Sequence, residues 1–175
     1  MNIQAAGSSK WLTVLSVCWS LAALTSQAAT PDIVVAVIDS GVLAGQALLK
    51  DRLLPGYDFI SGPKNPKGGR SADYSPDAAD ARCEGSTPSP VLRTHGTEVA
   101  QLVATASQLK VDGVNQRIQH VKILPVRLFG PCGMTRTDLL DALAWSAGLP
   151  IPNVPDNPHP ARVINLSLAG GKSSC

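Results

Sequence analysis

The feature that most constrains this chain is a run of six apolar residues at positions 33–38, five of which are β-branched. Such a run is typical of a strand that is buried on both faces inside a parallel sheet. Two similar runs cover residues 121–128 and 163–168, and helical patterns lie between the three runs. The sequence therefore predicts a three-layer α/β fold built on a parallel sheet.

The first predicted helix opens at His95, and its apolar face consists of Val99, Leu102, Val103 and Ala106. The second covers residues 137–147, with Thr135 or Thr137 as its cap and Gly148 as its stop. The apolar face of this helix consists of Leu139, Leu140, Leu143 and Ala147. Residues 53–93 and 150–160 are rich in Gly, Pro and polar side chains, so we expect loops there.

The first 28 residues have the pattern of a secretory signal peptide. Residues 11–24 are mainly apolar, and Ser26 and Ala28 are small residues at positions −3 and −1 of the expected cleavage site. A retained membrane anchor is the alternative, but the apolar stretch is short and contains two serines. We therefore expect residues 29–175 to be secreted, into the periplasm or the medium, and to be free of the membrane after signal cleavage.

Composition excludes several classes of protein. With 44% apolar and 16% charged residues, the chain can form a core and is not of the disordered type. A net charge of +2 offers no electrostatic basis for binding nucleic acid. After signal removal three cysteines remain, at positions 83, 132 and 175, and none has the C-x-x-C spacing of a zinc or thioredoxin-like site. An odd number implies an unpaired thiol or a missing partner.

Asp39 and His95 are the candidates for chemistry. Asp39 follows the first apolar run and precedes Gly41, and open parallel sheets bind ligands at the carboxyl ends of their strands. A carboxylate there is either a turn former or a site residue. His95, at a predicted helix start, would be kept neutral by the helix dipole as a general base requires, although alone it is more simply a surface or capping residue. Asp before His, with a later Ser, is a known order of the Ser-His-Asp triad.

Several motifs together resemble a known family. Residues 36–42 (AVIDSGV) resemble the aspartate motif of subtilisin-like serine proteases, and residues 95–100 (HGTEVA) resemble their histidine motif. Residues 163–171 (VINLSLAGG) resemble the strand that walls their specificity pocket. The segments similar to secreted subtilases of Gram-negative bacteria are residues 54–60, 122–132, 141–148 and 158–171. The resemblance implies a subtilisin-like fold, incomplete at its C-terminus, and a serine endopeptidase of extracellular proteins.

The resemblance also implies roles for individual residues. Asp39 would accept a hydrogen bond from His95, and His95 would deprotonate a serine hydroxyl. The residues expected to flank an extended peptide substrate are Leu128, Phe129, Gly130, Ser167, Leu168, Ala169 and Gly170. The cysteine pairing of the family implies a disulfide between Cys83 and Cys132.

The chain departs from the family pattern in one main respect. The Gly-Thr-Ser motif that carries the family's nucleophile does not occur in the 175 residues, and neither does the expected partner of Cys175. We therefore expect residues 29–175 to be the N-terminal portion of a peptidase domain, inactive by themselves. The alternative is a catalytically inactive truncated fragment or a peptide-binding remnant.

No cofactor is expected. Residues 65–80 resemble an Asp-rich segment of the family, which raises the question of calcium, but they keep only Asp73, Asp77 and Asp80. These carboxylates lack the Gly-punctuated spacing of a calcium loop, so a calcium site is disfavoured. Elsewhere, Trp145 is expected in the core, and Arg127 is expected to pair with an acidic neighbour.

Overall fold

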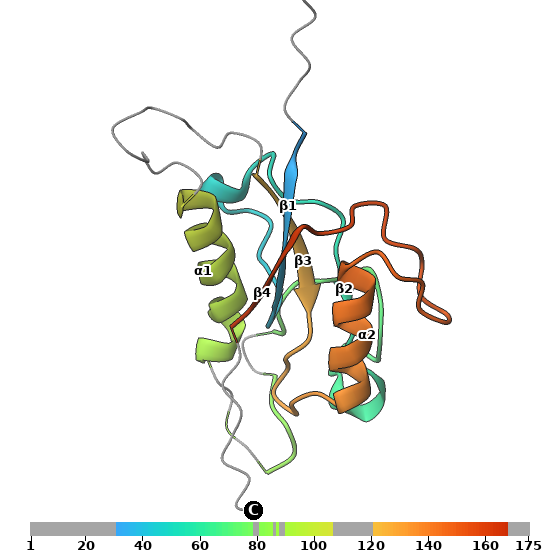
Figure 1. Cartoon of the computed structure of the whole chain (residues 1–175). Helices are drawn as coiled ribbons and strands as arrows, with labels where there is room; N and C mark the ends of the chain where they lie inside the picture. Colours follow the sequence, from blue (N-terminus) through green and yellow to red (C-terminus); the bar gives the residue numbers. More distant parts are fainter. Residues whose placement is uncertain (1–30, 79–80, 86, 88–89, 107–120, 168–175) are drawn as a thin grey trace, which may run out of the picture.

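The structure is a computed structural model that describes residues 31–167 except 79–80, 86, 88–89 and 107–120 (Figure 1). The expected signal peptide lies outside the described residues. The helices and strands are β1 (Ile33–Asp39), β2 (Tyr57–Asp58), α1 (Pro90–Ala106), β3 (Val121–Arg127), α2 (Arg136–Ser146) and β4 (Val163–Leu166). Two short 3-10 helices, η1 (Ala47–Leu49) and η2 (Gly62–Lys64), lie in the connections.

The strands form a parallel sheet with the order β2-β3-β1-β4. The register places Asp39 beside Arg127 of β3, and Val35 beside Val163 of β4. The three predicted strands and their parallel arrangement are confirmed, although β3 and β4 end one and two residues earlier than expected. The two-residue strand β2 lies inside the segment predicted to be a loop. The prediction missed this strand because two residues are too few to produce a sequence pattern.

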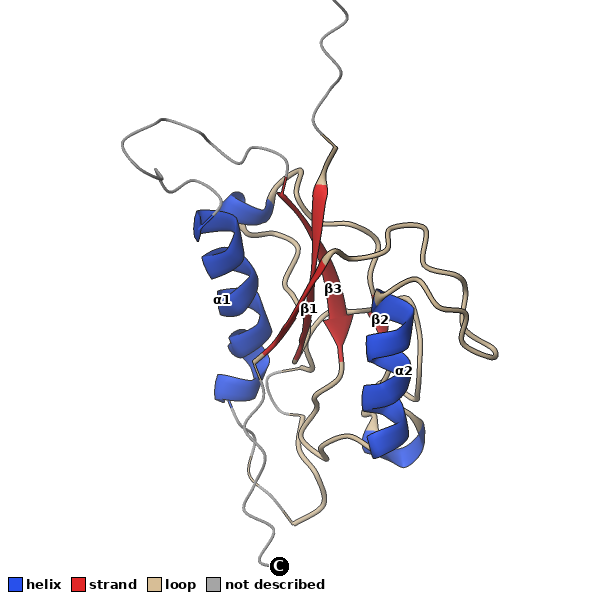
Figure 2. Cartoon of the chain, in the orientation of Figure 1, coloured by secondary structure: helices blue, strands red, loops and turns tan. Residues whose placement is uncertain are grey.

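The two helices cover opposite faces of the sheet (Figures 1 and 2). Alternate residues of β1 point to opposite sides, as in any strand. Ile38 belongs to the buried cluster that includes Trp145 of α2, whereas Val37 belongs to the cluster that includes Ala100 of α1. The three-layer α/β fold is therefore confirmed, and Trp145 is a core residue with 3% of its surface exposed.

Helix α1 begins at Pro90, five residues before the predicted start at His95. Proline is favoured at the first helical position, because its φ is already helical and its missing N–H would have had no partner there. The predicted apolar face is also wrong at Leu102, which is 68% exposed, while Ala100 and Ala104 are fully buried. Small side chains on the sheet side allow the helix to approach the strands closely.

Helix α2 begins and ends one residue earlier than predicted, and Thr135 is its N-terminal cap. The Thr135 hydroxyl accepts from the Asp138 N–H, and the Asp138 carboxylate accepts from the Thr135 N–H, both at 3.0 Å. Of the predicted apolar face, Leu139 and Leu143 pack against the core, but the prediction is wrong at Leu140, which is 55% exposed, and at Ala147, which is also exposed. The residues that α2 buries are Asp138, Ala142, Trp145 and Ser146. Asp138 can be buried because Arg70 donates to it at 2.9 Å.

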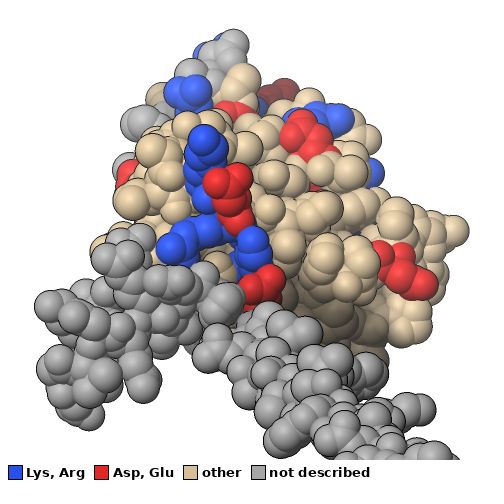
Figure 3. All heavy atoms as spheres, turned by 90° about the horizontal axis from the view of Figure 1, so that it is seen from above, with Lys and Arg blue, Asp and Glu red and all other residues tan. Residues whose placement is uncertain are grey.

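Cys83 and Cys132 form a disulfide, as the family resemblance implies, with Cα atoms 4.9 Å apart. It ties the segment before α1 to the loop after β3. Within the described ranges, no helix has the length and apolar character needed to cross a membrane. On the face seen in Figure 3, basic and acidic side chains are interspersed.

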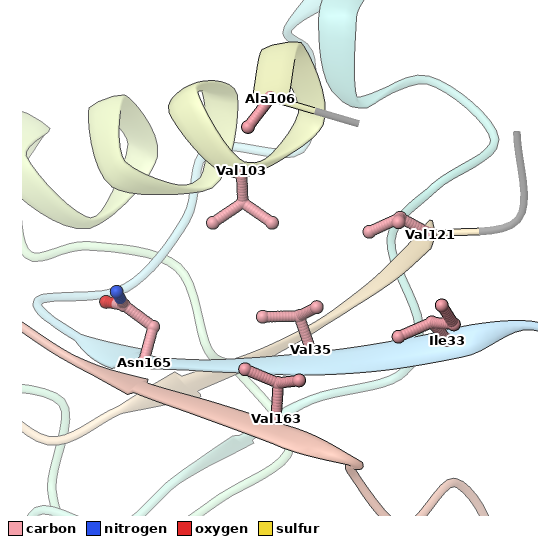
Figure 4. A pocket seen from close by; sticks show the side chains of 7 residues that line it. All are labelled: Ile33, Val35, Val103, Ala106, Val121, Val163 and Asn165. Atoms are coloured by element: carbon pink, nitrogen blue, oxygen red, sulfur yellow. The ribbon is translucent and has the colours of Figure 1, made fainter. Parts of the chain in front are cut away.

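Strand β4 lies at the edge of the sheet and presents apolar side chains to solvent. Val163 is 49% exposed, Ile164 37% and Leu166 40%. Beside β4, a cavity of about 340 Å³ lies between α1 and the sheet (Figure 4). Its lining residues are Ile33, Val35, Val103, Ala106, Val121, Val163 and Asn165. This cavity lies toward the start of β1, at the opposite end of the strand from Asp39.

Candidate active site

Asp39 and His95, which come from different elements, form a hydrogen-bonded pair. Asp39 is the last residue of β1, and His95 lies in the second turn of α1. The two atoms His95 Nδ1 and Asp39 Oδ1 are 2.8 Å apart. The Asp39 side chain is buried, whereas 40% of the His95 side chain is exposed. A buried carboxylate therefore holds the Nδ1 atom of an imidazole that is partly exposed to solvent.

The helix start at Pro90 corrects one expectation about His95. The dipole effect of a helix falls off within its first turn. Since His95 is the sixth residue of α1, the helix N-terminus does not act on its ring as the sequence suggested. The carboxylate of Asp39 is the group that contacts the ring, and it fixes which nitrogen faces the strand.

Short-range contacts lock α1 against the turn after β1. The Gly96 N–H donates to Ser40 Oγ at 3.1 Å, and the Leu43 N–H donates to Thr97 Oγ1 at 3.0 Å. A side chain at Gly96 would overlap the Gly41 carbonyl and lie 3.1 Å from Asp39 Oδ1. Sequence reasoning assigned no role to Ser40, Gly96 or Thr97. The signal that could have found them is their position directly beside Asp39 and His95 in the two motifs.

The turn after β1 also packs closely against the backbone at Tyr74. Gly41 has a φ of +100°, and a Cβ there would lie 2.6 Å from the Tyr74 carbonyl oxygen. The next residue, Val42, donates its N–H to the same carbonyl at 3.2 Å. The segment around Tyr74 therefore packs directly against the backbone that follows Asp39.

The segment Leu128, Phe129 and Gly130 begins where β3 ends, next to Asp39. The N–H groups of Leu128 and Phe129 donate to the Asp39 carbonyl at 2.7 and 3.3 Å. The Leu128 side chain is fully buried in the core, so only its backbone carbonyl could contact a peptide. Gly130 is packed closely, since a Cβ there would lie 3.1 Å from Arg127 Nη2 and from Asp77 Oδ2.

The second segment expected to contact substrate follows β4. Ser167 is exposed, and its hydroxyl donates to Asn165 Oδ1 at 2.8 Å. Leu168, Ala169 and Gly170 lie outside the described residues, as does Cys175. Because β1 lies between β3 and β4 in the sheet, the ends of β3 and β4 flank the position beyond Asp39.

A fully buried cation lies beneath the segment that follows β3. The Arg127 guanidinium pairs with Asp58 through Nη1 and with Asp77 through Nη2, and it also donates to Asn65 Oδ1 at 3.2 Å. The side chains of Arg127 and Asp58 are both fully buried. Burial raises the pKa of Asp58, although the Arg127 charge and three hydrogen bonds oppose that rise. The expected acidic partner of Arg127 is thus a pair of carboxylates that come from separate parts of the chain.

The arrangement defines a class of site. An acid–histidine pair lies at the carboxyl edge of a parallel sheet, where such sheets bind their ligands. A neutral imidazole held by a carboxylate can take a proton from a hydroxyl and return it to a leaving group. Among the described residues, no group of three or more His, Cys, Asp and Glu side chains is placed to hold a metal ion. An aspartate–histidine pair with this geometry can carry out such proton transfers.

Comparison with known proteins agrees with this class. Residues 30–175 match the sequence profile of the subtilase family, peptidase family S8. The chain belongs to the subtilase family.

Individual relatives are proteases. The chain is 39% identical over 148 residues to an extracellular basic protease of Dichelobacter nodosus, covering 79% of this chain and 24% of the relative. It is 38% identical over 147 residues to an extracellular protease of Xanthomonas campestris pv. campestris, covering 80% of this chain and 25% of the relative. A solved protease structure from Pseudoalteromonas arctica PAMC 21717 matches with a TM-score of 0.60 and 35% identity, over 80% of this chain and 42% of that chain. The chain thus spans about a quarter of the length of these two relatives.

Proposed function

We propose that this chain carries the aspartate and the histidine of a secreted serine endopeptidase, whose nucleophilic serine comes from residues other than these 175. The observation that carries the proposal is the 2.8 Å contact between His95 Nδ1 and Asp39 Oδ1 in a member of the subtilase family. The names of the two relatives, both extracellular proteases, support the substrate class and secretion.

The geometry supports a defined role for each member of the pair. With Nδ1 protonated, His95 donates to Asp39, and Nε2 is left to accept the proton of a serine hydroxyl. The serine oxygen then attacks the peptide carbonyl carbon, and His95 passes the same proton to the departing amine. Water hydrolyses the acyl-enzyme by the reverse sequence of proton transfers. The buried Asp39 carboxylate stabilises the positive imidazolium during each step.

The sheet order supports a site for an extended peptide. Neighbouring strands lie about 4.8 Å apart, so β3 and β4, which flank β1, are separated by about 10 Å. Beyond the end of β1, that gap has the width of one additional strand. A peptide there would run between the segment 128–130 and the segment 167–170, with backbone groups on both sides. Asp39 is the last residue of β1, where this gap begins, and His95 contacts it.

Catalysis is tested with a chimaera in which residues 29–167 replace the matching portion of the Dichelobacter nodosus relative. We expect the chimaera to react with a fluorophosphonate serine-hydrolase probe and to cleave a chromogenic peptide. His95→Ala should abolish both reactions, while His159→Ala, on the connection before β4, should leave them intact. Equal labelling of the His95→Ala chimaera would contradict the proposal.

The 175-residue chain itself provides a second test. We expect no stoichiometric reaction with the same probe, because the Gly-Thr-Ser motif is absent from it. Secretion is tested by expression in a Gram-negative host, where we expect the exported product to begin at Ala29. Stoichiometric labelling of the isolated chain, or a product that retains Met1, would overturn the corresponding part of the proposal.

A further inference from the structure

The ammonium group of Lys67 is enclosed by oxygen atoms. Nζ donates to the backbone carbonyls of Asp73 and Ser75 at 2.9 and 2.5 Å. It also lies 3.2 Å from Ser75 Oγ and 3.1 Å from Asp73 Oδ2. Only 18% of the Lys67 side chain is exposed. Four oxygens from two residues thus surround one positive charge, much as oxygen ligands surround a bound cation.

The backbone of Lys67 is fixed by its neighbour Asn65. The two N–H bonds of the buried Asn65 amide are shared among Asp58 Oδ2, the Ile60 carbonyl and the Gly69 carbonyl, at 2.9, 2.9 and 2.7 Å from Nδ2. Its Oδ1 accepts from the Lys67 N–H at 2.9 Å. Lys67 therefore reaches across the loop from a backbone position that is already anchored.

The carboxylates of this loop do not fit a calcium ion. Calcium takes six to eight oxygen ligands at 2.3–2.6 Å, usually with several carboxylates among them. Asp73 is already paired with Lys67, and Asp77 is paired with Arg127. Asp77 Oδ1 is buried without a hydrogen-bond partner in the described part of the chain, but it adjoins the Arg127 guanidinium and is one oxygen only. Asp80 lies outside the described residues.

We propose that the Lys67 ammonium is the resident cation of the loop from Asn65 to Ser75, in place of calcium, and that it is a positioning residue for the turn beside Asp39 and His95. The inference deepens the proposed function and rests on it for the role of that pair. The charge is supplied by the chain itself, so the loop closes without a metal ion.

A short series of contacts connects Lys67 with the candidate active site. Lys67 holds the carbonyls on both sides of Tyr74, at Asp73 and Ser75. The Tyr74 carbonyl between them accepts the Val42 N–H at 3.2 Å and would be struck by any side chain at Gly41. The Gly41 carbonyl in turn packs against the backbone of α1 at Gly96. Displacement of the Tyr74 carbonyl would therefore loosen the turn that separates Asp39 from α1.

The charge state of the loop agrees with this arrangement. The Ser75 hydroxyl and N–H donate to the Asp73 carboxylate, and Lys67 adds its positive charge. Together these contacts lower the pKa of Asp73 below its usual value, despite some burial. Asp73 therefore keeps its negative charge opposite Lys67 at neutral pH.

The test compares Lys67→Met, which keeps the aliphatic stem but loses the charge, with Lys64→Met at a neighbouring exposed lysine, both in the 175-residue chain. Amide hydrogen exchange is measured at Val42, whose N–H reports on the Tyr74 contact. We expect Lys67→Met to accelerate this exchange about ten-fold, since several charge-assisted hydrogen bonds are lost, and Lys64→Met to leave it unchanged. Unchanged exchange in Lys67→Met would overturn the proposal.

A rescue experiment distinguishes the charge of Lys67 from the packing of its side chain. A calcium titration distinguishes the effect of Lys67 from that of a bound metal ion. Lys67→Cys treated with 2-bromoethylamine regains an ammonium group at nearly the original distance, and we expect it to recover the protection of Val42. The wild-type chain receives the same treatment as a control. We expect neither millimolar calcium nor a chelator to change the exchange of Val42 in the wild type. Protection that requires calcium, or a failure of the rescue, would overturn the proposal.

A third readout concerns the positioning role in the chimaera described above. We expect Lys67→Met to lower kcat about ten-fold with little change in KM, because the turn beside the catalytic pair is displaced while the peptide-binding segments are not. If the chimaera is inactive in every form but the exchange results hold, the proposed function fails while the role of Lys67 in the loop stands. An active chimaera that is indifferent to Lys67→Met would remove the positioning role.

Discussion

The imidazole Nδ1 of His95 lies 2.8 Å from Oδ1 of Asp39, although 56 positions separate the two residues in the sequence. The strand β1 delivers the carboxylate at its carboxyl end, and the second turn of α1 delivers the imidazole. Their contact is made at the edge of the sheet where the segment after β3 also binds the Asp39 carbonyl. Strand β1, helix α1 and the segment after β3 thus meet at a single residue, Asp39.

The Asp39 carboxylate should be indispensable to the chimaeric peptidase. Asp39→Asn removes the negative charge that holds the imidazole and stabilises its protonated form. We expect kcat to fall about 10⁴-fold, the size of the loss seen when the triad aspartate of other serine proteases is replaced. Hydrolysis of a chromogenic peptide measures it, with the exposed Asp51→Asn as the matched control. A loss of less than ten-fold would exclude Asp39 from the catalytic pair.

Gly41 should tolerate no side chain. Gly41→Ala places a methyl group 2.6 Å from the Tyr74 carbonyl oxygen and also strains a φ of +100°. Gly68→Ala has a similar φ of +91° but open space around the new Cβ, so it isolates the backbone strain. We expect Gly41→Ala to lower the free energy of unfolding by about 2 kcal/mol more than Gly68→Ala does. Urea denaturation measures both, and equal losses would mean that the contact with Tyr74 contributes nothing.

The cap of α2 should contribute measurably to stability. Thr135→Ala removes the hydroxyl that accepts the Asp138 N–H, and such a change costs about 1 kcal/mol. Thr137→Ala, two residues further into the helix at an exposed position, removes a hydroxyl that does not cap it. We expect its effect to stay within about 0.5 kcal/mol. Thermal unfolding followed by circular dichroism compares the two variants, and a reversed order would assign the cap to Thr137.

Asp138 should make the free energy of unfolding depend on pH in the acidic range. Burial raises the pKa of its carboxyl, but hydrogen bonds from Arg70, Ser61 and Thr135 outweigh burial and bring the pKa below the usual value. A carboxyl whose pKa is lower in the folded state stabilises the protein above its unfolded pKa, about 3.9, and loses that contribution as the pH falls through the folded pKa. We expect Asp138→Asn to weaken the dependence of the unfolding free energy on pH below about 4, and Asp156→Asn to leave more of it intact. Identical pH profiles for wild type and Asp138→Asn would refute this.

The buried cluster of Arg127, Asp58 and Asp77 should destabilise the fold if Arg127 alone is replaced. Arg127→Met leaves Asp58 and Asp77 without their counter-charge in the protein interior, which costs about 3–5 kcal/mol. Combining it with Asp58→Asn and Asp77→Asn removes the uncompensated charges, so part of the stability should return. Arg136→Met, at an exposed arginine, is the control. Urea unfolding of the four proteins checks this order, and a triple variant less stable than Arg127→Met would contradict the electrostatic explanation.

Several parts of this protein could be predicted from the sequence because they depend on local patterns. The apolar run before Asp39 indicated a buried parallel strand, and the segment before Gly148 indicated a helix of the correct length, displaced by one residue. Motif resemblance paired Asp39 with His95 and Cys83 with Cys132, and the structure brings both pairs together. The roles of the residues in catalysis and substrate binding stay predictions for the experiments above.

Other features depend on which elements pack together, and the sequence could not reveal them. Helical periodicity favoured Leu102 and Leu140 as core residues, but the sheet selects the neighbouring faces, where alanine permits close approach and Asp138 meets Arg70. An acidic partner for Arg127 was expected, yet only the tertiary structure decides that Asp58 and Asp77 share it.

The sequence by itself determined the three longer strands, the chain order of Asp and His, and the family, because each can be recognised from short contiguous segments. The tertiary structure decided which oxygens surround Lys67 and which carbonyl Val42 meets, because those contacts join residues that are adjacent only after the loop has folded onto the sheet.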